Sequence, residues 1–338
     1  MNDFAWAVIG PGLIAHRFAD AVFRLPGMYT RSVLGSDTAA AGRFVAHWSR
    51  PGKPAPLVAP DLASLLADAA VDAVYIATPH SAYAPFVREC LAAGRPVLCE
   101  KPLVPNLATA REIVAQARDR NVFLMEAFWT RFLPVYSHVG RWLGAGAIGR
   151  VRAIQSSFCG PVTFDPEDRH YSPALAGGAL LDIGVYCLAM SRWVLESALG
   201  ACPEPTGLHV DGVLAPTGVD QRCAATIAFP DGVLAQLLCG FDCIADNSLR
   251  IFGDAGCISV PHTFWEGTHA VLTRPGHAPE TVQAPFRFNG FEYEIEEAMR
   301  CVRSGLVESP RMPHAETLAN VAMIDALRRR LGVRYPFE

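Results

Sequence analysis

The chain has 338 residues, of which 51% are hydrophobic and 18% are charged, with a formal net charge of −4. This length suits two domains, and the composition excludes an intrinsically disordered chain. Because there is no block of basic residues and no long apolar run, we expect neither a nucleic-acid partner nor a membrane segment. The ten cysteines lie singly, without a CxxC pair. That spacing indicates thiols in a reducing compartment, so we expect a cytoplasmic protein.

Short apolar runs alternate with helical patterns up to about residue 127. The first run follows Asp3 and has no cationic residue before it, which favours a strand over a signal peptide. Strands joined by helices in this way are typical of a parallel sheet covered on both faces, so residues 1–127 are predicted to be an α/β domain. The expected strands are Ala5–Ile9, Arg31–Leu34, Val71–Ala77, Pro96–Cys99 and Val122–Met125, and the expected helices are Leu13–Phe23, Ala82–Ala93 and Leu107–Arg120.

Beyond residue 127 the expected strands follow one another with few helices between them. Consecutive strands predict a large, open, mostly antiparallel sheet, so residues 128–338 are predicted to be an α+β domain. Asp231-Gly232 supplies a hairpin turn, because both residues tolerate positive φ. The expected strands are Val151–Phe158, Arg222–Phe229, Val233–Phe241, Ser248–Phe252 and Cys257–Val260. A helix at Arg131–Leu143 is expected before these strands, and the helices expected to pack on the sheet are Gly178–Leu195, Tyr293–Arg303 and Ala315–Leu331.

A glycine-rich turn, Gly10-Pro-Gly12-Leu13-Ile14-Ala15, joins the first strand to the first helix. In a dinucleotide fingerprint, the first glycine permits the tight turn and the second lets the backbone approach a pyrophosphate. The third position, here Ala15, allows close packing of helix and strand. A purely structural turn is the alternative. The position directly after a buried strand favours a Rossmann domain, with the pyrophosphate at the helix N-terminus.

The end of the second strand bears on the type of cofactor. An acidic residue there suits the ribose hydroxyls of NAD, whereas a hydroxyl or a cation suits the 2′-phosphate of NADP. Ser36 occupies this place, with Arg43 in the next helix, and Asp37 could bind a ribose or cap that helix. We expect NADP, with NAD as the alternative.

Two other strands end in polar residues at the same expected edge. Thr78 and His80 follow the third strand, and His80 could contact the nicotinamide ribose, the substrate or only the next helix. Glu100-Lys101 ends the fourth. Of the 29 basic residues only Lys53 and Lys101 are lysine. Because an ammonium can lower the pKa of a nearby hydroxyl or hold an oxyanion, Lys101 is a candidate catalytic residue.

The segment Gly178–Tyr186 carries two polar residues in an otherwise apolar helix. Asp182 and Tyr186 are four residues apart and are expected on one face. They could form an ordinary buried pair. With Lys101, they could also serve proton transfer, since reduction of a carbonyl requires a proton as well as a hydride.

Four motifs, in this order, resemble those of the GFO/IDH/MocA oxidoreductase family, and the resemblance covers nearly the whole chain. The branch that it resembles most contains the dimeric dihydrodiol dehydrogenases, glucose–fructose oxidoreductase and NADP-dependent xylose dehydrogenase. The motifs are Gly10–Ala15, Cys99–Leu103, Met125–Phe132 and Gly178–Tyr186.

The resemblance implies that Lys101 and Tyr186 are the catalytic pair, with Asp182 near the substrate and Trp129 and Arg131 bordering the nicotinamide end. It also implies a homodimer or a dimer of dimers. The predicted cofactor-binding residues are Gly10, Gly12, Leu13, Ile14, Ser36, Thr78, His80, Glu100 and Lys101.

The predicted function is hydride transfer between nicotinamide and a CH–OH or carbonyl carbon of a sugar or a cyclic trans-diol. A glycoside hydrolase assisted by bound NAD and a cofactor-binding regulator without turnover are the alternatives. No metal is expected, because the histidines and cysteines lack ligand spacing.

Overall fold

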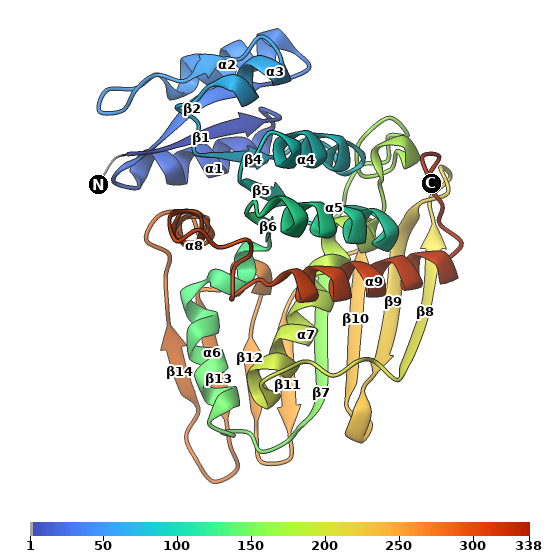
Figure 1. Ribbon diagram of the computed structural model, residues 1–338. Coiled ribbons are helices and arrows are strands. Elements are labelled where there is room, and N and C mark those ends of the chain that lie inside the picture. The colour runs from blue at the N-terminus through green and yellow to red at the C-terminus, as the bar shows by residue number, and fades with distance from the viewer. Residues whose placement is uncertain (1–2) are drawn as a thin grey trace. The chain divides into compact units, whose positions relative to one another are not determined.

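A computed structural model describes residues 3–338, which form two compact units (Figure 1). The first unit contains the chain up to Trp129 together with Arg287–Leu318, and the second contains Thr130–Phe286 and Ala319–Glu338. These units are defined by contacts within the structure. The division into two domains, residues 1–127 and 128–338, stays a prediction.

The first unit is built on a six-stranded parallel sheet of order β3-β2-β1-β4-β5-β6. This all-parallel order confirms the Rossmann-type sheet expected from the alternation of strands and helices. Its strands are β1 (Phe4–Ile9), β2 (Met28–Leu34), β3 (Leu57–Val58), β4 (Ala73–Ile76), β5 (Val97–Glu100) and β6 (Leu124–Ala127). Its helices before the second unit are α1 (Leu13–Arg24), α2 (Thr38–Trp48), α3 (Leu62–Ala67), η1 (His80–Ala82), α4 (Tyr83–Ala92) and α5 (Leu107–Arg120).

The strand register brings the carboxyl ends of β1, β4 and β5 to one edge of this sheet. Ile9 pairs with Ile76, and Ile76 pairs with Cys99. Strand order reverses between β1 and β4, which is where open α/β sheets bind their ligands. The glycine turn, His80 and Lys101 therefore all follow strands that end at this edge.

The second unit contains an eight-stranded sheet of order β14-β13-β12-β11-β7-β10-β9-β8. All neighbours are antiparallel except β7 and β10, which confirms a mostly antiparallel sheet. The strands are β7 (Val151–Cys159), β8 (Gly207–Leu214), β9 (Asp220–Ala228), β10 (Leu234–Gly240), β11 (Leu249–Gly253), β12 (Cys257–Val260), β13 (His269–Thr273) and β14 (Glu280–Gln283).

Two helices, α6 (Pro134–Gly144) and α7 (Val185–Leu199), pack together on one face of this sheet (Figure 1). The short helices that follow β6 include η2 (Trp129–Phe132), η3 (Pro173–Leu175), the π-helical turn η4 (Leu180–Gly184), η5 (Pro230–Gly232) and η6 (Phe264–Glu266). The expected hairpin turn between β9 and β10 is present, because Asp231 and Gly232 have φ of 59° and 76°.

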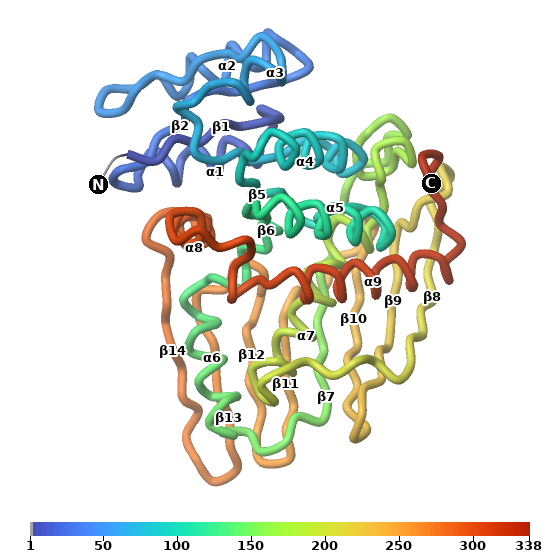
Figure 2. The backbone as a smooth tube through the Cα atoms, viewed as in Figure 1, coloured from blue at the N-terminus to red at the C-terminus, as the bar shows by residue number. Residues whose placement is uncertain are grey.

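The C-terminal part of the chain belongs to both units. Helix α8 (Glu292–Arg303) belongs to the first unit and contacts α1 there, although the sequence analysis placed it on the second sheet. Helix α9 (His314–Arg330) starts in the first unit, and the chain from Ala319 to the C-terminus belongs to the second (Figure 2). Arg330 donates to the carbonyl of Leu208 in β8.

The sequence has no uninterrupted apolar run of membrane-spanning length, but one helical stretch within residues 3–338, Pro173–Leu199, is long enough and apolar enough on average to span a membrane. Within the protein, 89% of its apolar window is buried, as in the core helix of a globular fold. Its apolar character is explained by this burial, because α7 packs against α6 and the sheet. The ten cysteines are all free thiols, and most of them are buried.

Candidate active site

The turn after β1 is shaped so that only glycine fits its first position. Gly10 has φ of +92°, and a Cβ there would lie 2.7 Å from the carbonyl oxygen of Ala77. At Gly12, which occupies the N-cap position of α1, a Cβ would meet no described atom within 4 Å. The next residue, Leu13, is 90% exposed. The first N–H groups of α1 therefore face open space without a side-chain cap, and this cradle fits a pyrophosphate at a helix N-terminus.

The polar residues after β2 form a small exposed cluster. Gly35 lies against the ring of Pro11, since a Cβ there would be 2.8 Å from two of its carbons. Asp37 caps α2 by accepting a hydrogen bond from the Ala39 N–H at 2.8 Å. Its other oxygen lies 3.5 Å from Nη2 of Arg43. The helix cap was one of the two roles considered for Asp37, and it leaves Ser36 and Arg43 exposed at this end of the sheet.

His80 is buried at the first position of η1, and its ring contacts that of Tyr83 edge-on at 5.7 Å. Thr78, two residues earlier, is half-buried. Both residues lie directly beyond the carboxyl end of β4, as the sequence predicted.

Lys101 follows a strand whose last residue is a buried acid. Glu100 accepts a 2.6 Å hydrogen bond from the phenol of Tyr75 on β4 and lies 3.2 Å from the Lys101 backbone N–H. Burial and the nearby Glu100 carboxylate raise the pKa of the Tyr75 phenol well above its ordinary value. The side chain of Lys101 is only half-buried, and its peptide bond to Pro102 is cis. The protein thus fixes the backbone of Lys101 through buried groups.

A second buried acid, Glu294 of α8, reaches the same part of the first unit. Burial and repulsion from Glu100 raise its pKa well above the ordinary value, while Arg17 acts in the opposite direction. Among residues 3–338, neither of its carboxyl oxygens finds a hydrogen-bond partner. A neutral, protonated Glu294 is the state that these surroundings favour.

Trp129 and Arg131 have different surroundings. Trp129 packs against Phe291 at 5.1 Å, and the guanidinium of Arg17 lies 4.4 Å from its ring centroid. Arg131 is buried and forms a 2.5 Å ion pair with Glu196, near the end of α7. Glu196 lies ten residues beyond Tyr186, so the two positions are roughly 15 Å apart along a helix. The structure thus gives Arg131 an ion pair inside the second unit, and its contact with substrate stays a prediction.

Asp182 lies in η4, the π-helical turn from which α7 continues. Turns of this kind frequently occur at functional sites. Its Oδ1 is 3.1 Å from Nη1 of Arg169, and its Oδ2 is 3.6 Å from Nε2 of His170. The other ring nitrogen of His170 lies 2.5 Å from Asp168. Two groups of the loop before the helix therefore hold the buried Asp182 carboxylate.

Tyr186 lies four residues further along the same helix and is also buried. Its ring is 5.6 Å from that of Phe158, which stacks on Trp265 with 3.4 Å between centroids and 2° between planes. Trp265 is held by its carbonyl, which accepts from the Thr130 hydroxyl at 2.8 Å. An aromatic pair thus lies beside the phenol.

No sequence motif predicted a site role for Arg169, His170, Phe158 or Trp265. A charged run, Asp168-Arg169-His170, in a loop rich in glycine and proline was the signal available for the first two. Phe158 was assigned to a strand without a role, and Trp265 follows a strand with no motif around it.

A Rossmann sheet with a glycine cradle at its switch point, followed in the chain by a large mostly antiparallel sheet, indicates a dinucleotide-binding protein with two structural units. Residues 4–128 match the family described as the oxidoreductase family with an NAD-binding Rossmann fold, and residues 136–259 match the GFO/IDH/MocA C-terminal domain. The chain belongs to the GFO/IDH/MocA family of NAD(P)-dependent oxidoreductases.

Relatives match over almost the entire chain. Trans-1,2-dihydrobenzene-1,2-diol dehydrogenase of Danio rerio is 34% identical and covers 98% of this chain and 97% of its own. The human enzyme of that name is 30% identical, with 98% of each chain covered. Among solved structures, a 3-ketoreductase from Actinomadura kijaniata in complex with NADP and TDP-benzene has a TM-score of 0.82 and 28% identity. It covers 97% of this chain and 98% of its own.

Proposed function

We propose that this protein is an NADP(H)-preferring dehydrogenase or reductase that acts on a secondary alcohol or carbonyl of a sugar or a cyclic trans-diol. The observation that carries the proposal is the glycine cradle at Gly10 and Gly12, in a chain whose relatives are named as diol dehydrogenases. A related ketoreductase binds NADP, which supports the cofactor. When bound, the nicotinamide gives or takes the hydride. The adenine end would lie near Ser36, and Thr78, His80 and Glu100 would line the nicotinamide end with Lys101.

Lys101 and Tyr186 are proposed as the catalytic pair because they occupy the family motifs. In alcohol oxidation the phenolate of Tyr186, held beside the Lys101 ammonium, would accept the proton of the substrate hydroxyl while the carbon gives its hydride to the nicotinamide. In carbonyl reduction Tyr186 returns the proton. The Lys101 ammonium stabilises the negative charge that develops on oxygen in either direction.

Asp182 is proposed to accept hydrogen bonds from substrate hydroxyls. Arg169 and His170 would keep this carboxylate in one orientation, since both lie within 3.6 Å of it. The stacked Phe158 and Trp265 beside Tyr186 offer an apolar face that suits a flat or ring-shaped substrate. Trp129 and Arg131 are proposed as further substrate contacts, since Nε and Nη1 of Arg131 find no hydrogen-bond partner among the described residues while Nη2 bonds to Glu196.

The experiment that tests this function follows absorbance at the reduced-nicotinamide band with NADP or NAD. The substrates are a panel of aldoses, inositols and trans-diols. We expect reduction of NADP by at least one of them. If no member of the panel reacts while NADP still binds, the proposal is wrong in its substrate class, and the assisted hydrolase or the regulator is favoured. Retention of NAD through purification would favour the hydrolase.

Cofactor preference should depend on Ser36. We expect Ser36→Glu to raise KM for NADP by about tenfold or more, because a carboxylate would repel the 2′-phosphate and suit the ribose hydroxyls of NAD. The measurement is kcat/KM for both cofactors, with Ser49→Glu, at an exposed position beyond α2, as the matched control. An unchanged ratio of the two values in Ser36→Glu would show that Ser36 does not select the cofactor.

The protein is further proposed to be a cytoplasmic homodimer or dimer of dimers. One face of the eight-stranded sheet carries mainly neutral side chains on β7, β9 and β10, among them Ala224 and the hydrogen-bonded pair Gln155 and Gln236, and Arg222 on this face is paired with Asp242. Such a face could pair with a second copy while burying little unpaired charge. Light scattering should give at least twice the 36.5 kDa of one chain. A mass of one chain at micromolar concentration would contradict this assembly.

A further inference from the structure

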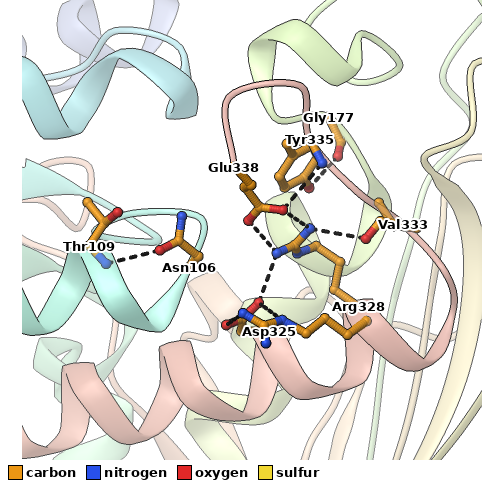
Figure 3. Close-up of polar contacts among 9 residues, drawn as sticks. Asn106, Thr109, Gly177, Asp325, Arg328, Val333, Tyr335 and Glu338 are labelled. Atoms are coloured by element: carbon orange, nitrogen blue, oxygen red, sulfur yellow. Dashed lines mark hydrogen bonds and ion pairs between the residues drawn. The ribbon is translucent and has the colours of Figure 1, made fainter.

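The helix that carries Asp182 and Tyr186 starts from a segment, Gly177–Leu180, that is held by residues far away in the sequence. The first contact comes from the C-terminal end of the chain. The phenol of Tyr335 donates a 2.7 Å hydrogen bond to the carbonyl of Gly177 (Figure 3). Tyr335 is buried, and its pKa is raised far above the ordinary value, chiefly by burial, so the phenol keeps its proton.

Arg328 of α9 fixes Tyr335 in place. Its guanidinium lies 4.5 Å from the ring centroid of Tyr335. It also donates to the carbonyl of Val333 at 3.1 Å and pairs with Glu338 at 2.5 Å and Asp325 at 2.8 Å. Figure 3 shows these groups converging on the arginine from α9 and from the last residues of the chain. The C-terminal segment is thus tied to α9 on both sides of Tyr335.

Asp220 of β9 holds the same segment by a separate contact. Its Oδ2 accepts a 2.6 Å hydrogen bond from the Leu180 N–H. Gly178, with φ of +122°, passes so close that a Cβ there would lie 2.4 Å from Asp220 Oδ1. Only glycine permits this approach. Tyr335 and Asp220 therefore fix the backbone on either side of Gly178.

We propose that Tyr335 is a positioning residue for the reaction: its hydrogen bond to Gly177 sets where η4 begins and so where Asp182 and Tyr186 lie. The inference rests on the proposed function, because it needs Tyr186 as the proton-transfer group. A proton-transfer group must lie within hydrogen-bond reach of the reacting oxygen, so a small displacement of the helix start slows the reaction.

Tyr335→Phe removes only the hydroxyl. We expect kcat to fall by about fivefold with NADP affinity unchanged, because one hydrogen bond of ordinary strength is lost. In a Tyr186→Phe background the same change should cause a much smaller loss, since only Asp182 is then left for Tyr335 to position. Glu338→Gln removes the charge that pairs with Arg328 and should also lower kcat, by a smaller factor than Tyr335→Phe.

Tyr136→Phe is the matched control, because Tyr136 is also a buried phenol of the second unit that donates to a backbone carbonyl, that of Phe264, at 2.6 Å. It should lower the unfolding temperature about as much as Tyr335→Phe without lowering kcat as far. Wild-type kcat in Tyr335→Phe, or an equal loss from this change in the wild-type and Tyr186→Phe backgrounds, would overturn the inference alone. Wild-type kcat in Tyr186→Phe would overturn the proposed function and the inference with it.

Discussion

Tyr186→Phe should lower kcat by about 10²- to 10⁴-fold, which is the usual contribution of a positioned acid or base. The ring of phenylalanine keeps the contact with Phe158 but has no proton to exchange with the substrate oxygen. Lys101→Met should lower kcat to a similar extent, because the charge on that oxygen loses its counter-ion. Steady-state kinetics and a fluorescence titration with NADPH would separate turnover from cofactor binding.

The chain contains its own control for the lysine. Lys53, the only other lysine, donates to the carbonyls of Leu25, at 2.5 Å, and Met28. Lys53→Met should therefore reduce the free energy of unfolding and leave kcat unchanged. Lys101→Met should lower kcat and leave the free energy of unfolding unchanged. Near wild-type turnover in both Tyr186→Phe and Lys101→Met, with cofactor bound, would remove these residues from the mechanism.

Asp220→Asn should stabilise the protein in a pH-dependent way. Burial raises the pKa of Asp220 to about 7, against an ordinary value of 3.8. An acid with a raised pKa binds its proton more tightly in the folded state. Ionisation of Asp220 therefore destabilises the folded state. This effect is absent below about pH 4, grows as the pH rises, and is complete above about pH 7. At 1.36 kcal/mol per pKa unit this amounts to about 4 kcal/mol.

Unfolding by urea at pH 5 and pH 8 would measure this effect. The asparagine can still accept from the Leu180 N–H, so the variant should exceed the wild type in free energy of unfolding by more at pH 8 than at pH 5. Asp246→Asn should change stability in the opposite sense, because hydrogen bonds from Ser248 and Ser157 lower the pKa of Asp246. An identical pH dependence in Asp220→Asn and wild type would show that Asp220 does not titrate in this range.

Most elements that position the proposed site could be predicted, because each has a local signal. A buried strand before Gly10-Pro-Gly12 predicts the cofactor turn, and an apolar strand before Glu100-Lys101 places the lysine at the sheet edge. The contacts of those residues have no such signal. The ion pair of Arg131 with Glu196 and the contacts of Arg169 and His170 with Asp182 join residues that are well separated in the sequence, 65 positions apart in the first case.

The strands that the sequence analysis missed are mainly at the edges of the two sheets. β3, β8 and β14 are edge strands with mostly exposed or half-buried side chains, so they lack the alternation that marks a strand with one buried face. The neighbouring β13 was missed as well. These strands form because a paired neighbour offers free backbone groups, which is a property of the assembled sheet.

By itself, the sequence determined the alternation of strands and helices, the glycine turn after the first strand and the helix bearing Asp182 and Tyr186, because periodicity and glycine φ preferences are local. Only the tertiary structure decided that α8 belongs with the first unit, that the Asp220 carboxylate contacts the backbone at Gly178 and that the Tyr335 hydroxyl donates a hydrogen bond to the Gly177 carbonyl. Those contacts depend on packing between segments up to 158 residues apart, for which the chain carries no local pattern.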